Sequence, residues 1–394
     1  MRLAILASHP IQYQAPLFRA LARRLDLHVF FAHEATPQEQ ADAGFGARFV
    51  WDVDLTSGYA NSFLHNVSRR PNASEFFGCD TPDIGDRLRQ GRFNAVLATG
   101  WGLKSYLQGI YAAKRLRLPV MARGDSHLLT PRSMSRAAAK AALYRPFLRL
   151  FDAALYVGQL SRAYYEHYGF PASRLFFSPH CVDAAWFALR ADTRAREEMR
   201  QRLAIDPGAF VLLLAGKLIA LKRPLDLIRA AAACRSRDRK VEVLIAGDGE
   251  LARLLVEEAA RTGVPLHMLG FRNQADMPAA YAAADCLTLP SASETWGLVA
   301  NEALACNRPI IVSDQCGCAP DLASDGTAGR TFRVGDIADF CAAIESVASD
   351  RDRGDAIANL SNRYSAARAV DGIEAAAEFS TGHRVRRKRL ALGS

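Results

Sequence analysis

The sequence predicts an α/β protein made of two consecutive domains, each a doubly wound parallel sheet flanked by helices. Two observations lead to this prediction. The chain has 394 residues, of which 50% are hydrophobic, and this is more apolar material than one ordinary core holds. Short apolar runs typical of strands alternate with amphipathic runs typical of helices along most of the chain. Such a β, α, β rhythm is typical of parallel sheets covered by crossover helices.

The first half of the chain contains two β, α, β units separated by a longer segment. In each unit an apolar strand leads into an amphipathic helix and then into a second strand. The expected elements are, in order, 3–7, 16–24 and 27–31, then 95–98, 103–116 and 119–122. Strands joined by a helix in this way run parallel in one sheet.

The second half repeats this alternation more closely, and a further helix is expected over 337–349. Its expected elements are, in order, 210–214, 224–234, 241–246, 251–261, 265–269, 277–284, 286–289, 301–305 and 309–312. A second doubly wound domain therefore follows the first.

The boundary between the domains is expected where a strand ends in the proline-containing turn 177–183, ahead of a charged helix over 194–203. The predicted segments are an N-terminal domain, 1–185, a C-terminal domain, 186–357, a helix that crosses back to the first domain, 358–380, and a disordered basic tail, 381–394.

The composition argues against a secreted or membrane-spanning chain. Charged residues make up 23% of the sequence, no apolar run is long enough for a transmembrane helix, and no cleavage site follows the first strand. The eight cysteines lack the paired spacings of a zinc ribbon or a disulfide framework, which predicts the reducing cytosol. We interpret the run Cys316-Gly317-Cys318 as small buried residues near a loop rather than a metal or redox pair.

The net charge of +9 and the pI near 9.3 suit a polyanionic partner. Part of the excess lies in the tail at 384–389, and another part lies at 132–149, where basic and apolar residues are interleaved. The second segment fits a basic amphipathic face on an anionic membrane surface, and it fits an ordinary solvated helix equally well. No aromatic ladder accompanies either segment, so we expect no nucleic acid partner.

Two carboxylates, Glu294 and Glu302, are separated by seven residues around the start of a helix. Glu294 lies in the loop just ahead of that helix, whose first turn offers free backbone N–H groups and a positive dipole end suited to a phosphate. Glu302 lies roughly two turns further along the same helix, so both acids can face one ligand at different depths. This order of turn, acid, helix start, acid and buried strand predicts a sugar-nucleotide site.

Basic and glycine-rich loops follow the other strands of the second half. Ligands of open α/β sheets bind at the carboxyl ends of the strands. After the strand 210–214, Gly216 permits a tight turn, and Lys217 and Lys222 can converge on a diphosphate. The loops that begin at Gly247 and at Gly270 allow a base or ribose to approach the backbone closely. Neither a P-loop nor a Gly-x-Gly-x-x-Gly turn is present, which argues against a kinase and a dinucleotide dehydrogenase.

These ordered motifs resemble the retaining glycosyltransferases of family 4, in the bacterial polysaccharide-biosynthesis branch. The resemblance spans essentially the whole second domain and implies the GT-B fold, in which two Rossmann-like domains face a central cleft. In the first domain it is carried by three shorter runs, 8–13, 123–127 and 178–183. These runs resemble the variant loops of one bacterial branch of the family, and His9-Pro10-Ile11 replaces the Gly-Gly turn that is more typical after the first strand.

The resemblance also implies roles for individual residues. Glu294 would bind hydroxyls of the transferred sugar, Glu302 would bind the ribose, and Lys217 and Lys222 would neutralise the diphosphate leaving group. Position 217 is usually arginine in the family, and lysine keeps the charge but loses the bidentate fork. The donor-binding candidates are Glu302, Gly216, Trp296, Gly297, Leu298, Val299, Gly247, Phe271 and Arg272.

Four residues of the first domain are candidates for the acceptor side: His9, Gln12, Asp125 and His180. His127 is placed with Glu294, Lys217 and Lys222 in the catalytic set, because it follows a strand end and fits contact with the transferred sugar or the acceptor. For each histidine the alternative is a structural hydrogen bond. Asp125 is a candidate to orient His127 or an acceptor hydroxyl.

The implied activity is transfer of a hexose, with retention, from a nucleotide-diphosphate sugar to a glycan or a lipid-linked saccharide in cell-surface polysaccharide biosynthesis. No cofactor and no metal are expected, because two lysines and a helix terminus supply positive charge. The expected location is cytoplasmic, either free or peripheral on the inner face of the cytoplasmic membrane. Two alternatives stay open: a sugar-nucleotide epimerase on the same fold, and a non-catalytic scaffold of a polysaccharide-assembly complex.

Overall fold

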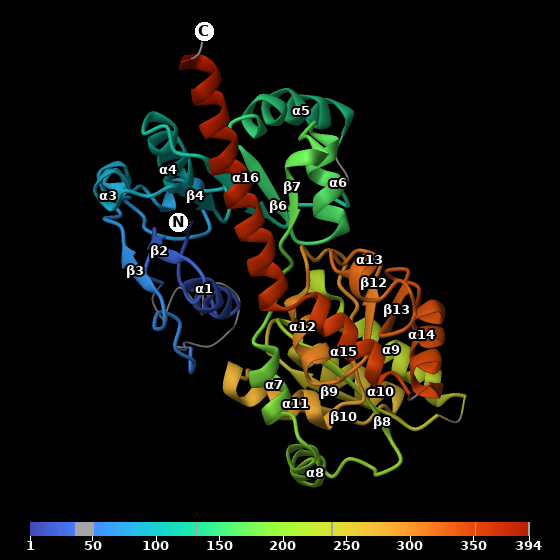
Figure 1. Cartoon of the computed structure of the whole chain (residues 1–394). Coiled ribbons are helices and arrows are strands. Elements are labelled where there is room, and N and C mark those ends of the chain that lie inside the picture. The colour runs from blue at the N-terminus through green and yellow to red at the C-terminus, as the bar shows by residue number, and fades with distance from the viewer. Residues whose placement is uncertain (36–50, 131–132, 238, 351, 393–394) are drawn as a thin grey trace. The chain divides into compact units, whose positions relative to one another are not determined.

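The computed structural model describes residues 1–35, 51–130, 133–237, 239–350 and 352–392, which form two compact units (Figure 1). Unit 1 contains the described residues of Met1–Glu39, Asp54–His180 and Ala366–Ser394. Unit 2 contains those of Gln40–Val53 and Cys181–Ser365. The chain therefore passes from unit 1 to unit 2 within the proline-containing turn 177–183 and returns to unit 1 after residue 365.

Unit 1 is built on a seven-stranded sheet with the order β3-β2-β1-β4-β5-β6-β7, in which all described pairs are parallel. The strands are β1 (Arg2–Ala7), β2 (Asp26–Phe31), β3 (Ala60–Phe63), β4 (Ala95–Ala98), β5 (Val120–Gly124), β6 (Ala153–Tyr156) and β7 (Leu175–Phe177). Five of the six residues of β1 are buried, as expected for a strand covered on both faces. The reversal of strand order beside β1 is the topology of a doubly wound fold.

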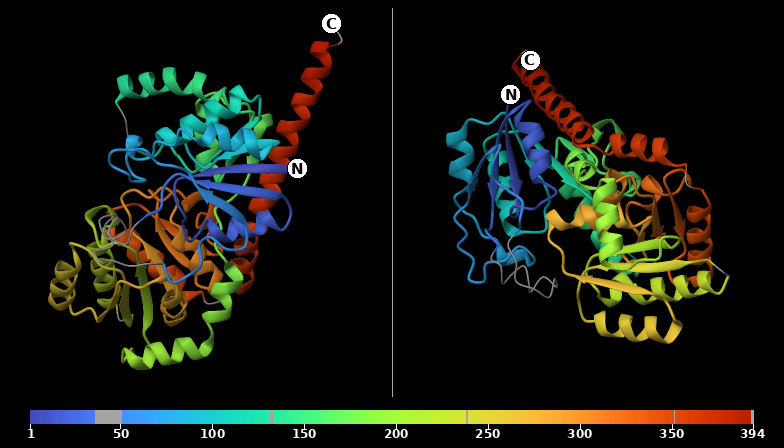
Figure 2. Two further views of the ribbon diagram at one scale, coloured as in Figure 1. Left: turned by 90° about the vertical axis from the view of Figure 1, so that its left-hand side faces the viewer. Right: turned by 90° about the horizontal axis from the view of Figure 1, so that it is seen from below.

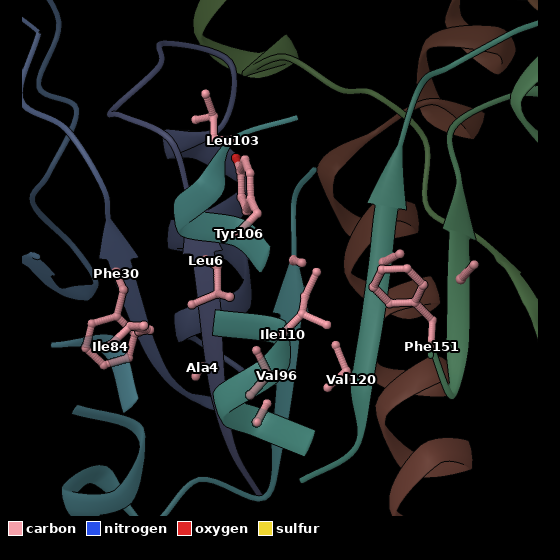
Figure 3. Close-up of a cluster of buried hydrophobic side chains, with 14 of the residues drawn as sticks. Ala4, Leu6, Phe30, Ile84, Val96, Leu103, Tyr106, Ile110, Val120 and Phe151 are labelled. Carbon is pink, nitrogen blue, oxygen red and sulfur yellow. The ribbon is translucent and has the colours of Figure 1, made fainter. Parts of the chain in front are cut away.

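Helices connect these strands, and their apolar sides cover the sheet. They are α1 (Ala15–Ala22), α3 (Ile84–Gly91), α4 (Lys104–Arg115), α5 (Met134–Leu148) and α6 (Gln159–His167), with short 3-10 turns η2 (Phe76–Gly78) and η3 (Ala172–Arg174). Figure 3 shows how the side chains of Leu6, Val96 and Val120 come from adjacent strands and meet Ile110 of α4. This buried cluster packs α4 against β1, β4 and β5.

The long helix α16 (Ala366–Leu392) belongs to unit 1 and packs against β6 and β7 (Figures 1 and 2). A Cβ at Gly372 would lie 1.9 Å from the carbonyl oxygen of Phe177, so the helix backbone approaches the sheet as closely as glycine allows. The side chain of Ser178 donates a hydrogen bond to the carbonyl oxygen of Ala369 (3.0 Å). These contacts tie α16 to the turn after β7.

The helix and tail expected at 358–380 and 381–394 differ from the structure in two respects. Two helices are present, α15 (Gly354–Arg363) and α16, with a break at Tyr364 and Ser365. The expected disordered tail is instead helical to Leu392, while 393–394 lie outside the described residues. The physical reason is propensity: the segment consists mostly of arginine, lysine, leucine and alanine, which are good helix formers and extend a helix that is already packed.

Unit 2 is built on a six-stranded sheet with the order β10-β9-β8-β11-β12-β13, again parallel in all described pairs. The strands are β8 (Phe210–Ala215), β9 (Val241–Ala246), β10 (Leu266–Gly270), β11 (Cys286–Leu289), β12 (Ile310–Ser313) and β13 (Gly329–Phe332). All six residues of β8 and of β9 are buried. The two predicted doubly wound parallel sheets are confirmed, and β3, β6 and β13 are additional to the predicted strands.

Helices of unit 2 follow the strands in the predicted alternation. They are α7 (Ala184–Arg190), α8 (Thr193–Arg202), α9 (Pro224–Arg235), α10 (Ala252–Thr262), α11 (Met277–Ala283), α12 (Leu298–Ala305), α13 (Ala319–Leu322) and α14 (Ile337–Ser349), with the 3-10 turns η4 (Ala220–Lys222) and η5 (Gln274–Asp276). α14 begins and ends at the predicted residues. The rings of Phe332 in β13 and Phe340 in α14 stack at 4.0 Å, which fixes this helix on the sheet.

The basic segment at 132–149 forms α5, although Arg132 lies outside the described residues. Within this helix only Leu148 is buried, and Leu143 is 66% exposed. Lys140 does not simply face solvent, because its ammonium group lies 4.6 Å from the ring centre of Tyr144. Every helix among the described residues is too short or too polar to cross a bilayer.

Candidate active site

In unit 2, the loop that carries Glu294 is held in place by the loop after β12. The backbone N–H of Glu294 donates to the carbonyl oxygen of Gln315 (3.2 Å), and the N–H of Gly317 donates to the carbonyl oxygen of Glu294 (2.9 Å). A Cβ at position 317 would lie 1.8 Å from the carbonyl oxygen of Thr295. Glycine is therefore required there, and Cys316 and Cys318 on either side of it are fully buried.

The side chain of Glu294 forms an ion pair with Lys222 in η4. Both side chains are largely covered, at 19% and 25% exposed. Burial lowers the pKa of Lys222, and the nearby charge of Lys217 lowers it further. Burial likewise lowers the pKa of Lys217. The structure thus brings the two predicted lysines and Glu294 together at the carboxyl ends of β8 and β11.

The glycine turn after β9 fits against the turn after β8. A Cβ at Gly247 would lie 1.8 Å from the carbonyl oxygen of Gly216, so the two predicted glycines lie in direct backbone contact. The N–H of Leu218 donates to the carbonyl oxygen of Asp248 (2.8 Å). Because no side chain separates the two loops, the lysine loop has little freedom to move.

The helix α12 has its N-terminal end at the predicted donor residues. Gly297 is the N-cap, and α12 begins at Leu298. The backbone N–H groups of the first turn have no partner within a helix and point out of its end. The indole of Trp296 is buried, donates to the Asn301 side chain (2.8 Å) and contacts the ring of Tyr364. The indole of Trp296 is therefore a structural group and is not offered to a ligand.

Glu302 lies further along α12 and accepts a hydrogen bond from the hydroxyl of Tyr281 in α11 (2.6 Å). Burial raises the pKa of Glu302 to about 7, although the hydrogen bond from Tyr281 acts in the opposite direction. The carboxyl group therefore changes its charge near neutral pH. Tyr281 itself is fully buried; the sequence offered no signal for this pairing, because the two residues lie 21 positions apart on different helices.

Phe271 and Arg272 follow β10 as predicted, but Arg272 is engaged by its own turn. Its guanidinium donates to the carbonyl oxygen of Leu269 (2.8 Å) and lies 3.8 Å from the carboxylate of Asp276. Its Nε atom is buried and has no hydrogen-bond partner among the described residues. The Nε–H of Arg272 is thus a donor without an acceptor among the described residues, and Phe271 is partly exposed beside it.

In unit 1, the acceptor-side candidates lie on loops at the carboxyl ends of β1, β5 and β7. The imidazole of His180, which is buried, forms a hydrogen bond with the carboxylate of Asp125 (Nε2 to Oδ2, 3.2 Å), whose side chain is 41% exposed. The ring of Tyr13 meets His180 edge-on at 6.0 Å. These three residues, separated by up to 167 positions, therefore form one cluster.

The protonation of this cluster is set by burial and by the contact between its two titratable groups. Burial lowers the pKa of His180, while the hydrogen bond to Asp125 acts in the opposite direction. Burial is the largest single influence on Asp125 and would raise its pKa, but the hydrogen bond and charge of His180, a backbone hydrogen bond and the charge of Arg123 together lower it. At neutral pH the cluster therefore holds a neutral imidazole and an ionised carboxylate.

Arg123, the first residue of the run 123–127, is buried next to this cluster. Its guanidinium donates to the side chain of Ser178 (3.2 Å) and to the carbonyl oxygens of Ser178 (3.2 Å) and Pro179 (2.8 Å). The side chain is 5% exposed. Arg123 therefore fixes the turn that carries His180.

The remaining first-domain candidates have local partners. Nδ1 of His9 lies 3.0 Å from the hydroxyl of Ser8, and Nδ1 of His127 accepts the backbone N–H of Leu129 (3.3 Å). Because Nδ1 of His127 is an acceptor, its Nε2 carries the proton in the neutral ring. Gln12 lies partly exposed in the turn before α1. Asp125 bonds to His180 rather than orienting His127.

One group among the described residues could hold a metal ion by ligand type and spacing: Cys234, Cys341 and Glu345. Both thiols are buried between α9 and α14, with their sulfur atoms 2.8 Å apart. Burial raises the pKa of Cys234 and of Cys341. None of the predicted site residues belongs to this group.

Proteins of known structure share this architecture over nearly the whole chain. HepE of Anabaena in complex with UDP superposes with a TM-score of 0.70 at 18% identity, covering 95% of this chain and 98% of that one. WaaG, a glycosyltransferase involved in lipopolysaccharide biosynthesis, superposes with a TM-score of 0.62 at 17% identity, covering 96% and 100%. The fold is the GT-B fold of glycosyltransferases, as the sequence predicted.

The second domain also resembles a known sequence family. Residues 195–366 match the profile of the family Glycosyl transferases group 1. A D-inositol 3-phosphate glycosyltransferase of Pseudarthrobacter chlorophenolicus is 32% identical over 235 residues, covering 56% of this chain and 54% of the relative. A protein of the same name from Salinispora arenicola is 37% identical over 145 residues, 34% of this chain and 32% of the relative. The chain thus spans about half the length, or less, of these curated relatives.

Proposed function

We propose that this protein is a retaining glycosyltransferase that moves a hexose from a nucleotide-diphosphate sugar to a hydroxyl group of a glycan or lipid-linked saccharide in cell-surface polysaccharide biosynthesis. The observation that carries the proposal is the ion pair between Lys222 and Glu294 beside Lys217 and the N-terminal end of α12. A cationic group, a hydrogen-bond acceptor and a helix N-terminus are the groups that a diphosphate and a sugar require.

Donor binding would exchange the partner of Lys222. The diphosphate offers this ammonium group a stronger anion than a single carboxylate, and Lys217 and the first N–H groups of α12 would share the remaining charge. The carboxylate of Glu294, released from Lys222, would then accept hydrogen bonds from hydroxyl groups of the hexose. Glu302, which already accepts a hydrogen bond from Tyr281, would accept hydrogen bonds from the ribose hydroxyls. Uridine diphosphate is the nucleotide that HepE of Anabaena holds, which supports a nucleotide-sugar donor here.

The proposed chemical step is a front-face displacement. The bond between the anomeric carbon and the phosphate oxygen breaks, and the acceptor oxygen forms a bond to that carbon on the same face. The acceptor proton passes to the departing phosphate oxygen, so no protein base is needed. Lys217, Lys222 and α12 stabilise the charge that develops on the leaving group, which is the main electrostatic contribution. Glu294 positions the sugar and does not transfer a proton.

On the acceptor side, the polar loops of unit 1 suit a hydroxyl-rich ligand. One carboxylate oxygen of Asp125 is hydrogen-bonded to His180. The exposed part of the carboxylate can accept a hydrogen bond from a hydroxyl group of the acceptor substrate. His127 can donate from Nε2, and His9 and Gln12 lie on the neighbouring loop after β1. Because the curated relatives are named D-inositol 3-phosphate glycosyltransferases, a phosphorylated cyclitol is a second acceptor class to test.

A membrane-bound acceptor would fit a chain that binds the anionic inner face of the cytoplasmic membrane. The side chains of Met134 and Leu143 on α5 are 91% and 66% exposed, and Arg136 and Arg145 accompany them on the same helix. Sedimentation with vesicles that contain anionic lipid tests this, with neutral vesicles as the control. Equal sedimentation with both would reject the membrane partner.

The direct test is a transfer assay with Lys222→Ala and Glu294→Ala. Each change should lower kcat/KM by about 10²–10³-fold, because each removes a group aimed at the leaving group or the sugar. Lys240→Ala is the matched control: it breaks the exposed ion pair between Lys240 and Asp206 at the other end of the sheet and should leave transfer unchanged. Circular dichroism verifies the fold. Wild-type turnover in both site variants would refute the proposal.

Two further measurements separate the alternatives. An epimerase would convert the sugar nucleotide without any acceptor, whereas the transferase requires one. A scaffold would show no rise in melting temperature with any nucleoside diphosphate or its sugar.

The anomeric configuration of the product, measured by NMR, decides between retention and inversion. Unchanged activity after chelation is the expected result for a metal-independent enzyme.

A further inference from the structure

A cavity of about 230 Å³ lies at the amino ends of the strands of unit 2, opposite the edge that carries the donor loops. Its wall is formed by the residues just before β11 and β12, the first residue of β8, the end of α14 and the start of α15. The polar and glycine residues of the lining include Asp285, Asn307, Arg308, Asp350, Arg353 and Gly354. A six-residue strand spans roughly 20 Å, so this cavity and the donor loops are separate places on one sheet.

Arg308 is the unusual member of the lining. Its Nε atom is buried and has no hydrogen-bond partner among the described residues. Burial lowers the pKa of Arg308, and the charge of Arg196 lowers it further. A covered guanidinium without an acceptor is costly, because desolvation of its N–H groups is not offset by hydrogen bonds.

The carboxylate of Asp285, which lines the same cavity, cannot supply that acceptor. Asp285 already receives hydrogen bonds from Arg196 (2.6 Å), from Arg200 (2.6 Å) and from the backbone N–H of Val211 (2.8 Å). The other acid that faces Arg200, Glu242, is bonded to His267 (2.7 Å). Among the described residues, the guanidinium groups of Arg196, Arg200 and Arg308 therefore outnumber the carboxylates of Asp285 and Glu242, and an excess of positive charge remains.

The opposite wall is rigid and neutral. Arg353 is 5% exposed; its guanidinium donates to the carbonyl oxygen of Thr327 (2.9 Å) and pairs with the carboxylate of Asp350 (3.0 Å). Gly354, the first residue of α15, has no atom within 4 Å of the place where a Cβ would lie. The cavity therefore has a fixed wall, open space at Gly354 and an unmatched cation at Arg308.

We propose that this cavity binds a small phosphorylated compound, with its phosphate group on Arg308. A phosphate group supplies the negative charge and the acceptor oxygens that Arg308 lacks, and the planar guanidinium can bind two of its oxygens at once. The cavity has the volume of about seven water molecules, which leaves room for more than a bare phosphate. Asn307, next to Arg308, supplies an amide for hydroxyl groups of the rest of the compound. The inference is independent of the proposed transferase activity.

The test is a binding titration of the full chain with inorganic phosphate and with glucose 6-phosphate at constant ionic strength, followed by calorimetry and by melting temperature. Wild-type protein should bind at least one of the two. Arg308→Ala should weaken that binding by about tenfold or more, because it removes the bidentate partner. Arg308→Lys, which keeps the charge and loses the fork, should lie between them.

Two variants keep the result interpretable. Gly354→Phe fills the open side of the cavity without touching Arg308, and should block binding even if Arg308→Ala folds poorly. Lys222→Ala changes the donor loops and should retain the phosphate response, which separates this site from the donor site. Binding that Arg308→Ala and Gly354→Phe leave unchanged, binding that Lys222→Ala abolishes, or no binding of either compound would each overturn the proposal.

Discussion

The two sites of this chain are built by different means. In unit 2 the donor loops meet backbone to backbone, with Gly317 against Thr295 and Gly247 against Gly216. In unit 1 the loops are joined by side chains that bridge distant positions, such as Arg123 to Ser178 and Asp125 to His180. A backbone contact allows one residue type and little variation, whereas a side-chain bridge can be rebuilt with other residues. Under the proposed function, donor recognition would be tied to the fold, and acceptor recognition would be open to change.

The largest effect is expected from Gly317→Ala. The new methyl group would meet the carbonyl oxygen of Thr295 and displace the loop that carries Glu294. Overpacking of this kind costs about 1–3 kcal/mol of unfolding free energy. Because Glu294 would be misplaced, we also expect transfer to fall by about a hundredfold.

Urea unfolding and a transfer assay measure both effects. Gly382→Ala is the control, since nothing lies within 4 Å of a Cβ at that helical position; it should leave stability equal or slightly higher. If Gly317→Ala behaved like Gly382→Ala, the idea that backbone contact defines the donor loops would fail.

The corresponding change in unit 1 is Arg123→Ala. It leaves the carbonyl oxygens of Ser178 and Pro179 without their donor in a buried place, which should cost about 1.5–3 kcal/mol. Unlike the glycine variant, it should leave nucleotide binding unchanged, because the donor loops belong to unit 2. Urea unfolding and a UDP titration test the two halves of this prediction; a large loss of UDP affinity would argue against separate sites.

A pH effect on stability is expected from Glu302. Its pKa is raised to about 7 in the folded chain, so its stabilising contribution is full below the ordinary carboxyl pKa and is lost as the pH rises through about 7. Between pH 5 and pH 8 the free energy of unfolding should fall by on the order of 2 kcal/mol from this group. Glu302→Gln, which still accepts from Tyr281, should lack this part of the pH dependence. Parallel curves for the two proteins would contradict the assignment.

The smallest effect is expected from Lys217→Arg, which introduces the residue more usual in the family. The positive charge is kept, and the planar guanidinium can bind two oxygens of the diphosphate at once. The value of kcat/KM should therefore change by no more than about threefold. Lys217→Ala should reduce it far more. A large loss with arginine would show that the loop accepts only the compact ammonium group.

Much of the donor site could be predicted from the sequence, because its parts are short-range. Gly216, Lys217 and Lys222 lie in one loop, and Glu294 and Glu302 flank one helix start, so spacing alone relates them. The need for Gly317 could not be predicted: its neighbour Thr295 belongs to a loop 22 positions away, and only the folded sheet brings them together.

The contacts within the first domain could not be predicted from the sequence either, because their partners lie even further apart along the chain. Asp125 and His180 are 55 positions apart, and Tyr13 and His180 are 167 apart. Each residue could be placed at a strand end from its local pattern, but the partner of each depends on the order of strands in the sheet. The cavity at Arg308 is a further case, since its charge imbalance arises from α8, β8 and β11 meeting in space.

The return of α16 to unit 1 has a consequence for how the chain is made. The ring of Phe176 in β7 contacts Phe379 in α16, yet almost two hundred residues of unit 2 are translated between these segments. At about 5–20 residues per second, the ribosome needs roughly 10–40 s for that stretch. During this time the face of β6 and β7 has no cover from its own chain, so the unit that begins first on the ribosome is the last to be completed.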